Sequence, residues 1–420
     1  MSSHCPVRLC TALVLSLFAL GVSAEETGVS QKPPVTAPTP VSSAPNNGLE
    51  GFDFNQSNGL YATITAFNSF EEPKLSGHTT IGLKHVKDFA KDFEVEACLQ
   101  NGAAPLVVIQ LGLGAHANSK LAKLWMRYLH DAGCHVVAMD STFIPRFNDC
   151  SRHGVIGNIE AEALMLANVI DAIKQSSALN GKVTKLGLIG CSYGSVVCLN
   201  LAKLAQDGKT PVKPDRVLAF SPPVRMQTAA GLLDSFWVED RWNYTEVDLY
   251  NALADRKPQS DGTGIPVSDS MMRAGLAASF RIDLKEVVEY CDRQYKLGML
   301  PRGDEGDEEY RRDKAGQYTF SQFMNEMTYP YWAAHGQASS PQDIWAHGDL
   351  RVLLEHCPPG VRVFIAQDDP INESSELQQL REALDKQACN VLTVLPRGGH
   401  MGYVGCNWHK RVVQEMFGDK

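Results

Sequence analysis

The chain has 420 residues, of which 44% are hydrophobic and 21% charged, so it can form one large domain or two ordinary ones around a sizeable core. Its formal net charge of −9 at pH 7 argues against the clustered basic surface that nucleic-acid binding requires. We therefore predict no nucleic-acid partner.

The first residues have the pattern of an export signal. Arg8 precedes an almost purely apolar stretch at residues 9–22, which ends in Val22-Ser23-Ala24. The last and third-last of these residues suit signal peptidase, so we predict cleavage after Ala24. A membrane anchor is the alternative, but the run is shorter than the roughly 20 apolar residues of a span. We predict a signal peptide over residues 1–24, a periplasmic or secreted protein, and no transmembrane segment in the mature chain.

The next segment changes character twice. Residues 25–50 are rich in Pro, Ser, Thr and Ala and predict a disordered linker. Residues 61–67 and 92–98 then alternate between apolar and polar side chains, which predicts two half-buried strands.

Short apolar runs then alternate with helical patterns. The predicted strands are residues 105–111, 135–139, 185–189, 216–220, 361–365 and 390–394, and the predicted helices are residues 119–132, 158–175, 193–206, 374–386 and 408–417. Continuous β-branched and aliphatic runs suit strands that are buried on both faces. The fold class we predict is α/β, with a mostly parallel central sheet and helices on both faces.

One interval interrupts this alternation. Residues 221–359 contain no clear strand pattern and hold Trp237, Trp242, Trp332 and Trp345. We predict a helical, lid-like insertion over one end of the sheet, which divides the core into residues 51–220 and 360–420. Ordinary crossover helices with surface loops are the alternative.

The cysteines allow disulfides without defining them. Of the 11 in the chain, Cys5 and Cys10 lie in the predicted signal peptide, which leaves an odd number. Export permits disulfides, and an odd number leaves at least one thiol without an intrachain partner.

Residues 190–194 read Gly-Cys-Ser-Tyr-Gly and lie directly between a predicted strand and a predicted helix. In that position G-x-S-x-G is a nucleophile elbow with Ser192 as nucleophile. The flanking glycines permit the sharp turn. At the start of the helix, the N–H of Tyr193 and the helix dipole could stabilise an oxyanion.

A serine nucleophile needs a base, and the base needs an acid that orients it. His400 lies among glycines just beyond the last predicted strand, and Asp368 and Asp369 follow the strand at residues 361–365. The carboxyl ends of parallel strands all lie at the same end of the sheet, which is also the end where the elbow lies. Since adjacent residues in an extended loop face opposite ways, we predict Asp369 as the acid and keep Asp368 as the alternative. A glycine-rich surface turn around His400 and an Asp-Asp-Pro turn are the structural alternatives.

A second oxyanion donor is expected from the loop after residues 105–111. That loop reads Gly112-Leu113-Gly114, and its glycines let the backbone approach a substrate closely. We predict the N–H of Leu113 as this donor.

The order Ser192, Asp369, His400 along the chain is that of the α/β-hydrolases. The chain resembles this superfamily over residues 61–416. Asp-Asp-Pro in the acid loop and Gly-Gly-His-x-Gly-Tyr in the histidine loop are similar to an esterase-like bacterial branch. One position departs from the pattern, because many members carry His-Gly in the oxyanion loop where this chain has Leu111-Gly112.

The resemblance implies a serine hydrolase that cleaves carboxylic esters through an acyl-serine intermediate. It implies a small-molecule or lipid-like acyl substrate, no cofactor and no metal. A peptidase, an amidase or an acyltransferase on the same fold, and a non-catalytic binding protein, are the alternatives, because one fold hosts many functions.

Overall fold

The computed structural model describes residues 48–240, 268–301, 308–356 and 358–418. The predicted signal peptide, residues 25–47 of the predicted linker, and Trp242 lie outside the described residues. None of the helices in the described ranges combines the length and hydropathy that crossing a membrane takes.

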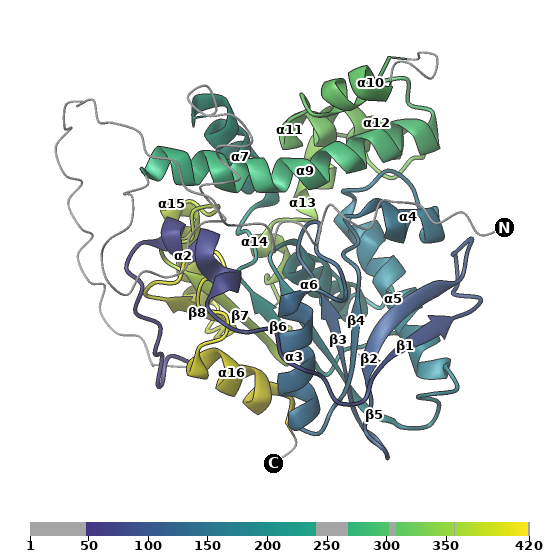
Figure 1. The fold of residues 1–420 in the computed structure, drawn as a ribbon, viewed down its shortest axis with the longest axis vertical. Helices are drawn as coiled ribbons and strands as arrows, with labels where there is room; N and C mark the ends of the chain where they lie inside the picture. The colour runs from purple at the N-terminus through teal and green to yellow at the C-terminus, as the bar shows by residue number, and fades with distance from the viewer. Residues whose placement is uncertain (1–47, 241–267, 302–307, 357, 419–420) are drawn as a thin grey trace, which may run out of the picture.

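The centre of the described structure is an eight-stranded sheet with the strand order β1-β2-β4-β3-β5-β6-β7-β8 (Figure 1). Its strands are β1 (His78–Leu83), β2 (Phe93–Cys98), β3 (Ala104–Gln110), β4 (His135–Met139), β5 (Val183–Cys191), β6 (Arg216–Phe220), β7 (Val361–Ala366) and β8 (Leu392–Leu395). Only β2 runs against the others, pairing antiparallel with β1 and β4, while all other pairs are parallel. The predicted mostly parallel sheet is confirmed.

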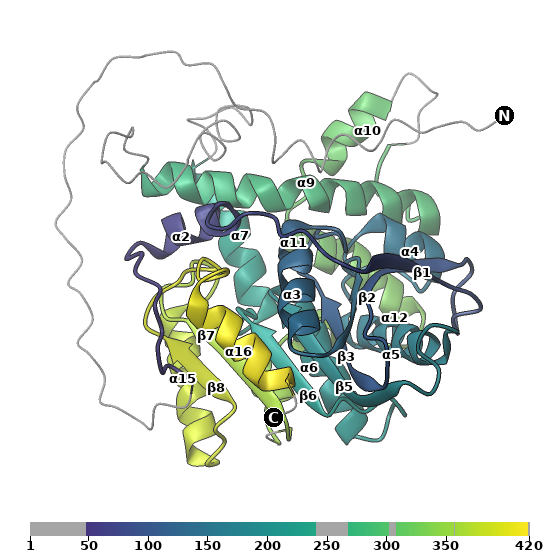
Figure 2. The same cartoon turned by 60° about the horizontal axis from the view of Figure 1, so that its bottom comes forward.

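Helices cover both faces of this sheet, as predicted (Figure 2). They are α3 (Lys120–Asp131) and α16 (Asn407–Phe417) on one face, and α5 (Ile159–Gln175), α6 (Tyr193–Gln206) and α15 (Ser374–Lys386) on the other. Along β3, Val107 and Ile109 pack toward α3, whereas Leu106 and Val108 pack toward α5 and α6. Burial on both faces explains why these strands read as unbroken apolar runs.

Between β6 and β7 the described residues form helices. These are α7 (Met226–Asp240), α9 (Asp269–Tyr295), α10 (Glu308–Ala315), α11 (Phe320–Gln322), the π-helical turn η5 (Phe323–Thr328), α12 (Tyr329–Ala334), α13 (Pro341–Ala346) and α14 (Leu350–Leu353). Among these residues, sheet-type pairing is limited to an isolated bridge between Arg225 and Asp349. Helix α9 lies across the top of the molecule in Figure 1 and contacts α7, α4 and the N-terminal helix α2. This long helix therefore bridges distant parts of the fold.

The predicted strand at residues 61–67 is wrong. The structure has a helix there, α2 (Gly59–Thr65), followed by a 3₁₀ turn, η2 (Ala66–Asn68). The side chain of Asn58 caps α2 by accepting the N–H of Tyr61 at 2.9 Å. Ala62, Thr63 and Ala66 are buried, at the spacing of one helix face. Tertiary contacts of this buried helix face override the alternation of apolar and polar side chains, which by itself suits a strand.

Two further elements had no predicted counterpart. Strand β1 lies at the sheet edge, and its first three residues are exposed, so it lacks an apolar run. Helix α4 (Pro145–Ser151) is short and begins with Pro145, whose missing N–H costs nothing in the first turn.

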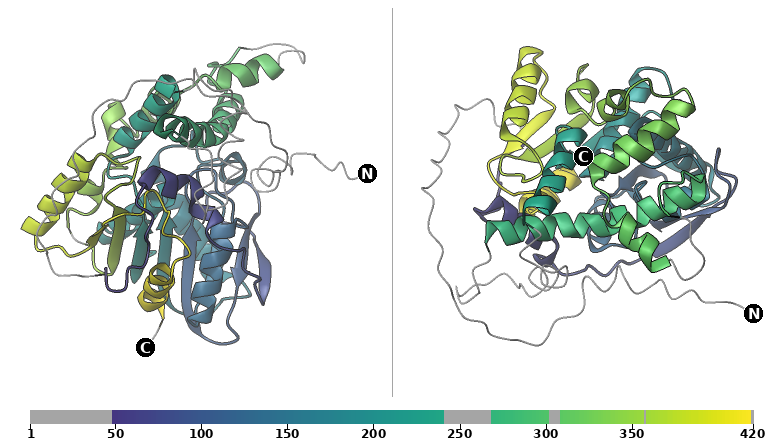
Figure 3. Two further views of the ribbon diagram at one scale, coloured as in Figure 1. Left: turned by 60° about the vertical axis from the view of Figure 1, so that its left-hand side comes forward. Right: turned by 90° about the horizontal axis from the view of Figure 1, so that it is seen from above.

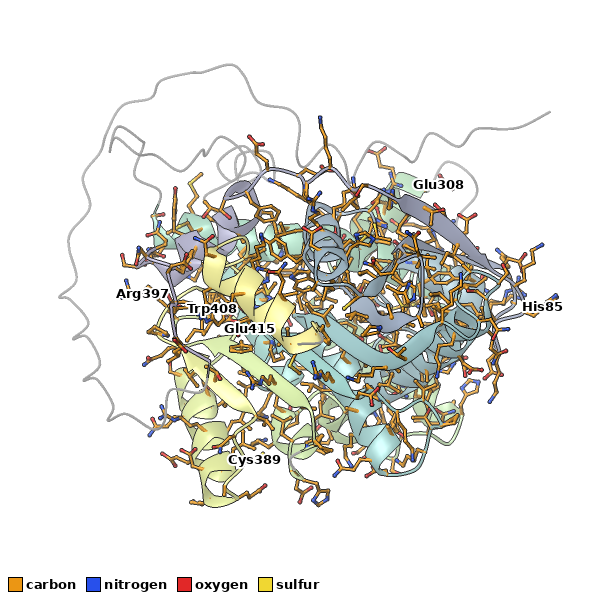
Figure 4. All side chains as sticks on the ribbon, turned by 90° about the horizontal axis from the view of Figure 1, so that it is seen from below. His85, Glu308, Cys389, Arg397, Trp408 and Glu415 are labelled. Carbon is orange, nitrogen blue, oxygen red and sulfur yellow. The ribbon has the colours of Figure 1, made fainter. Side chains whose placement is uncertain are left out.

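The described end of the predicted linker lies along α16. The indole N–H of Trp408 donates to Gly48 O at 2.7 Å, and the ring of Phe52 meets that of Trp408 edge-on, with centroids 5.1 Å apart. Figure 4 labels Trp408 on this helix. The segment before α2 is thus packed against the last helix of the chain.

Candidate active site

Ser192 occupies a strained turn between β5 and α6. Its φ is +51° and its ψ is −126°, a conformation that side chains rarely adopt. Its backbone N–H donates to Phe220 O at 2.9 Å, which ties the turn to the end of β6. The turn places Ser192 immediately before the first helical residue of α6.

Two glycines make the turn sterically possible. A Cβ on Gly190 would lie 2.7 Å from the backbone of Ser195, and a Cβ on Gly194 would lie 2.3 Å from Leu111 O. Both distances are shorter than real Cβ contacts allow, and both involve backbone atoms that cannot move aside. The glycine spacing predicted for a nucleophile elbow therefore follows from contacts of helix α6 with β5 and the end of β3.

The structure brings His400 and Asp369 together. His400 Nδ1 lies 3.0 Å from Asp369 Oδ2, and both side chains are buried. The other carboxylate oxygen, Oδ1, accepts the N–H of Ile371 at 3.1 Å. A carboxylate that accepts a hydrogen bond from Nδ1–H leaves the other ring nitrogen, Nε2, free to act as a base.

Asp368 makes no hydrogen bond to the imidazole within the described residues. Its Oδ1 accepts the backbone N–H of Gly399 at 2.8 Å. Burial, with Asp369 close by, raises the pKa of Asp368 above its usual value. The two adjacent carboxylates thus have different partners. Asp369 is hydrogen-bonded to the imidazole of His400, and Asp368 is hydrogen-bonded to the backbone of the loop that carries His400.

The elbow and the histidine loop converge on the end of β6. Phe220 O accepts from Ser192, and the next residue, Ser221, accepts the N–H of Met401 on its hydroxyl at 3.3 Å. His400 Nε2 is buried and makes no hydrogen bond within the described residues. This nitrogen therefore makes no hydrogen bond to the Ser192 hydroxyl.

The oxyanion loop runs directly past the serine. A Cβ on Gly112 would lie 3.1 Å from Ser192 Cβ, and the N–H of Gly112 donates to Cys191 Sγ at 3.2 Å. In the described part of the chain, the backbone N–H groups of Leu113 and Tyr193 make no hydrogen bond with another backbone group. N–H groups without a backbone partner, one on the loop that passes Ser192 and one on the residue after it, are of the kind that can receive a negatively charged oxygen.

These features together define the architecture. The chain has the α/β-hydrolase fold. The evidence is the strand order, with a single antiparallel strand near one edge, and the elbow after β5.

No protein-family model matches the sequence. No curated protein matches it either. Solved structures do, among them an esterase from Pyrococcus furiosus, with 12% identity, a TM-score of 0.43, and coverage of 84% of this chain and 94% of that one. An esterase from Pyrobaculum calidifontis is 14% identical, with a TM-score of 0.42, and the match covers 85% of this chain and 88% of that one. An esterase/lipase from an uncultured bacterium is 10% identical, with a TM-score of 0.42, and the match covers 89% of this chain and 92% of that one. At these values the likenesses say nothing about substrate, and the fold rests on the strand order and the elbow.

Sequence reasoning missed a buried carboxylate beneath the elbow. Glu162 on α5 accepts the phenolic O–H of Tyr193 at 2.8 Å and the N–H of Gly157 at 2.8 Å. Burial raises the pKa of Glu162 above its usual value. The contact anchors the side chain of Tyr193, whose N–H is the predicted oxyanion donor. Its only sequence signal was a charged residue inside a helical apolar pattern.

An apolar cavity of about 20 Å³ lies beside Leu113 and Tyr193, the two predicted oxyanion donors, and is also lined by the helices that follow β6. Its lining contains no charged side chain and consists of Leu113, Phe143, Gly157, Ile159, Tyr193, Met226, Ala230, Phe320, Met324, Ile344 and Trp345. A cavity of this size holds about one water-sized group. Its walls suit a small apolar group.

Proposed function

We propose that this protein is an exported serine hydrolase that cleaves carboxylic esters through an acyl-serine intermediate. The observation that carries the proposal is the buried Asp369–His400 hydrogen bond on the same strand-end edge as the strained Ser192 turn. An acid, a base and a nucleophile in this order on this fold are the parts that acyl transfer needs.

Each group has one chemical task in this mechanism. His400 takes the proton of Ser192 as the serine oxygen attacks the ester carbonyl, and Asp369 stabilises the imidazolium. The N–H groups of Tyr193 and Leu113 receive the oxyanion. His400 then gives its proton to the departing alcohol, which leaves the acyl group on Ser192. Water attacks that ester with His400 again as base, releasing the acid and restoring the serine.

The apolar cavity supports an ester with an apolar acyl group. It is bordered by Leu113 and Tyr193, whose N–H groups would hold the carbonyl oxygen, so a small apolar end of the acyl group could enter it from that point. Pockets for such groups are lined mainly by apolar and aromatic side chains. We further propose that residues 221–359 form a lid over residues 51–220 and 360–420, which the position of α9 supports.

Export is also part of the proposal. Its main support is the sequence pattern of residues 1–24. Cys389, labelled in Figure 4 near the start of β8, is disulfide-bonded, which suits an oxidising compartment. N-terminal sequencing of the protein from the periplasm or the medium should begin at Glu25. Retention of the full chain in the membrane would favour the anchor instead.

A fluorophosphonate probe tests the nucleophile directly, because it reacts only with an activated serine. The folded wild type should be labelled, and Ser192→Ala should abolish both labelling and ester hydrolysis. Ser195→Ala is the matched control, since Ser195 lies three residues later in the first turn of α6, is also buried and donates its hydroxyl to Phe220 O at 2.9 Å. It should still be labelled. A folded wild type that resists the probe contradicts the proposal.

Substrate comparison separates the alternatives on the same fold. Turnover of p-nitrophenyl esters should exceed that of aminoacyl anilides. The reverse ranking would identify a peptidase or amidase. Transfer of the acyl group to an added alcohol in preference to water would identify an acyltransferase.

A further inference from the structure

We propose that Thr63, on helix α2, is a positioning residue for the base His400. This inference rests on the proposed function, because it concerns how the proposed base is held. It makes α2, which precedes all strands of the sheet, a working part of the active site.

The hydroxyl of Thr63 joins α2 to the histidine by two hydrogen bonds. It accepts the backbone N–H of His400 at 2.8 Å and donates to Gly59 O at 2.7 Å. Both Thr63 and His400 are buried. Because the hydroxyl donates to one group and accepts from another, its orientation is fixed. Asp369 holds the ring of His400 and Thr63 holds its backbone, so the imidazole is held at two points.

Close backbone packing reinforces this connection. A Cβ on Gly399 would lie 1.9 Å from Gly59 O, and a Cβ on Gly402 would lie 2.7 Å from Ala62 Cβ. A Cβ on Gly59 would lie 2.2 Å from Asp368 O. Helix α2 therefore touches the histidine loop on both sides of His400 and also touches the acid loop. A shift of α2 would have to move the base, the acid loop or both.

The lid helix contacts the same element. Helix α9 packs on α2, and the views in Figure 3 show α9 extending over it. Helix α2 thus lies between α9 and the histidine loop. Removing its hydrogen bond should loosen the base without touching the nucleophile.

The same helix offers a matched control. Thr65 donates its hydroxyl to Tyr61 O at 2.8 Å, the same four-residue backbone contact that Thr63 makes with Gly59. Thr65 has no hydrogen bond to the histidine loop within the described residues. Thr63→Val and Thr65→Val therefore each remove one side-chain-to-backbone hydrogen bond of the same type, but only Thr63→Val leaves the N–H of His400 without its acceptor.

The experiment measures ester hydrolysis, fluorophosphonate labelling and thermal unfolding on the full chain. We expect Thr63→Val to lower kcat by about 10- to 100-fold with KM changed less than about twofold, since a small misplacement of a catalytic group costs rate. Thr63→Ser keeps the hydroxyl and should restore kcat to within about threefold of wild type. Thr65→Val should stay within about twofold. Should Thr63→Val not fold, the smaller Thr63→Ala takes its place.

Two results would overturn the inference. One is equal activity in Thr63→Val and Thr65→Val. The other is a loss in Thr63→Val that merely follows its folded fraction and that Thr63→Ser does not rescue.

A second readout separates this inference from the proposed function. The Nδ1–H proton of His400, assigned by its disappearance in Asp369→Asn, should shift or exchange faster in Thr63→Val by nuclear magnetic resonance. If the wild type is never labelled by the probe, the proposed function fails and this signal still tests the position of the imidazole. An unchanged signal in Thr63→Val contradicts the inference.

Discussion

The elbow and the histidine loop are supported in different ways. The turn at Ser192 depends on glycines within its own five-residue motif, Gly190 and Gly194, which let α6 approach β5 and the end of β3. His400 depends on residues far away in the chain: Asp369 is 31 residues before it and Thr63 is 337 residues before it. The comparison teaches that a local motif is enough to find the proposed nucleophile, whereas the groups that orient the proposed base cannot be found in this way.

The largest expected effect tests the two adjacent carboxylates of the histidine site. Asp369→Asn should lower kcat by about 10³- to 10⁴-fold, because the imidazole loses the anion that orients it and stabilises its charged form. Asp368→Asn should cost less than about tenfold, since its amide oxygen can still accept the N–H of Gly399. Steady-state hydrolysis of one ester by both variants decides the matter. A larger loss of kcat in Asp368→Asn than in Asp369→Asn would identify Asp368 as the acid and contradict the assignment of Asp369.

The next effect tests the local support of the elbow. Gly194→Ala should lower the free energy of unfolding by about 3 kcal/mol, because the new methyl group meets the backbone oxygens of Gln110 and Leu111. Gly231→Ala is the control, as Gly231 lies exposed in helix α7 with open space around it. That change should stabilise by about 0.5–1 kcal/mol through helix propensity. Urea unfolding followed by circular dichroism measures both. A stable Gly194→Ala would show that α6 does not need this close approach.

The smallest effect concerns a distant support of the oxyanion loop. A Cβ on Gly114 would lie 1.8 Å from Asp283 Oδ2, so this carboxyl group of α9 lies directly against the loop. Burial, then the charge of Glu286, raises the pKa of Asp283 to about 7, although His116 opposes the shift. Folding thus disfavours the ionised form, and the wild type loses stability as the pH rises from about 4 to 7.

Asp283→Asn should remove this pH-dependent loss. We expect the variant to exceed the wild type in free energy of unfolding at pH 8, with the difference shrinking toward pH 4. Unfolding curves across this range provide the measurement. A difference that does not change with pH would show that Asp283 is not held in this environment.

Much of the fold could be predicted from the sequence because its signals are local. The strand at residues 216–220 and the helix at residues 193–206 were predicted with the bounds that β6 and α6 have in the structure. Both segments have apolar side chains at the spacing of their own secondary structure, and this spacing can be read from neighbouring residues alone. The prediction at residues 61–67 failed because Thr63 and Ala62 are buried against a loop at the other end of the chain, and no local pattern records that contact.

What the sequence determined by itself is the succession of strands from residue 92 onward and the elbow at residues 190–194, because apolar periodicity and glycine placement are properties of neighbouring residues. Tertiary structure alone decided which of two adjacent aspartates reaches His400, and it alone placed Thr63 on the histidine backbone and Glu162 beneath Tyr193. These contacts join polar groups on separate elements. Their geometry exists only after the elements have packed, because a hydrogen bond requires a distance and an angle that a one-dimensional pattern does not contain.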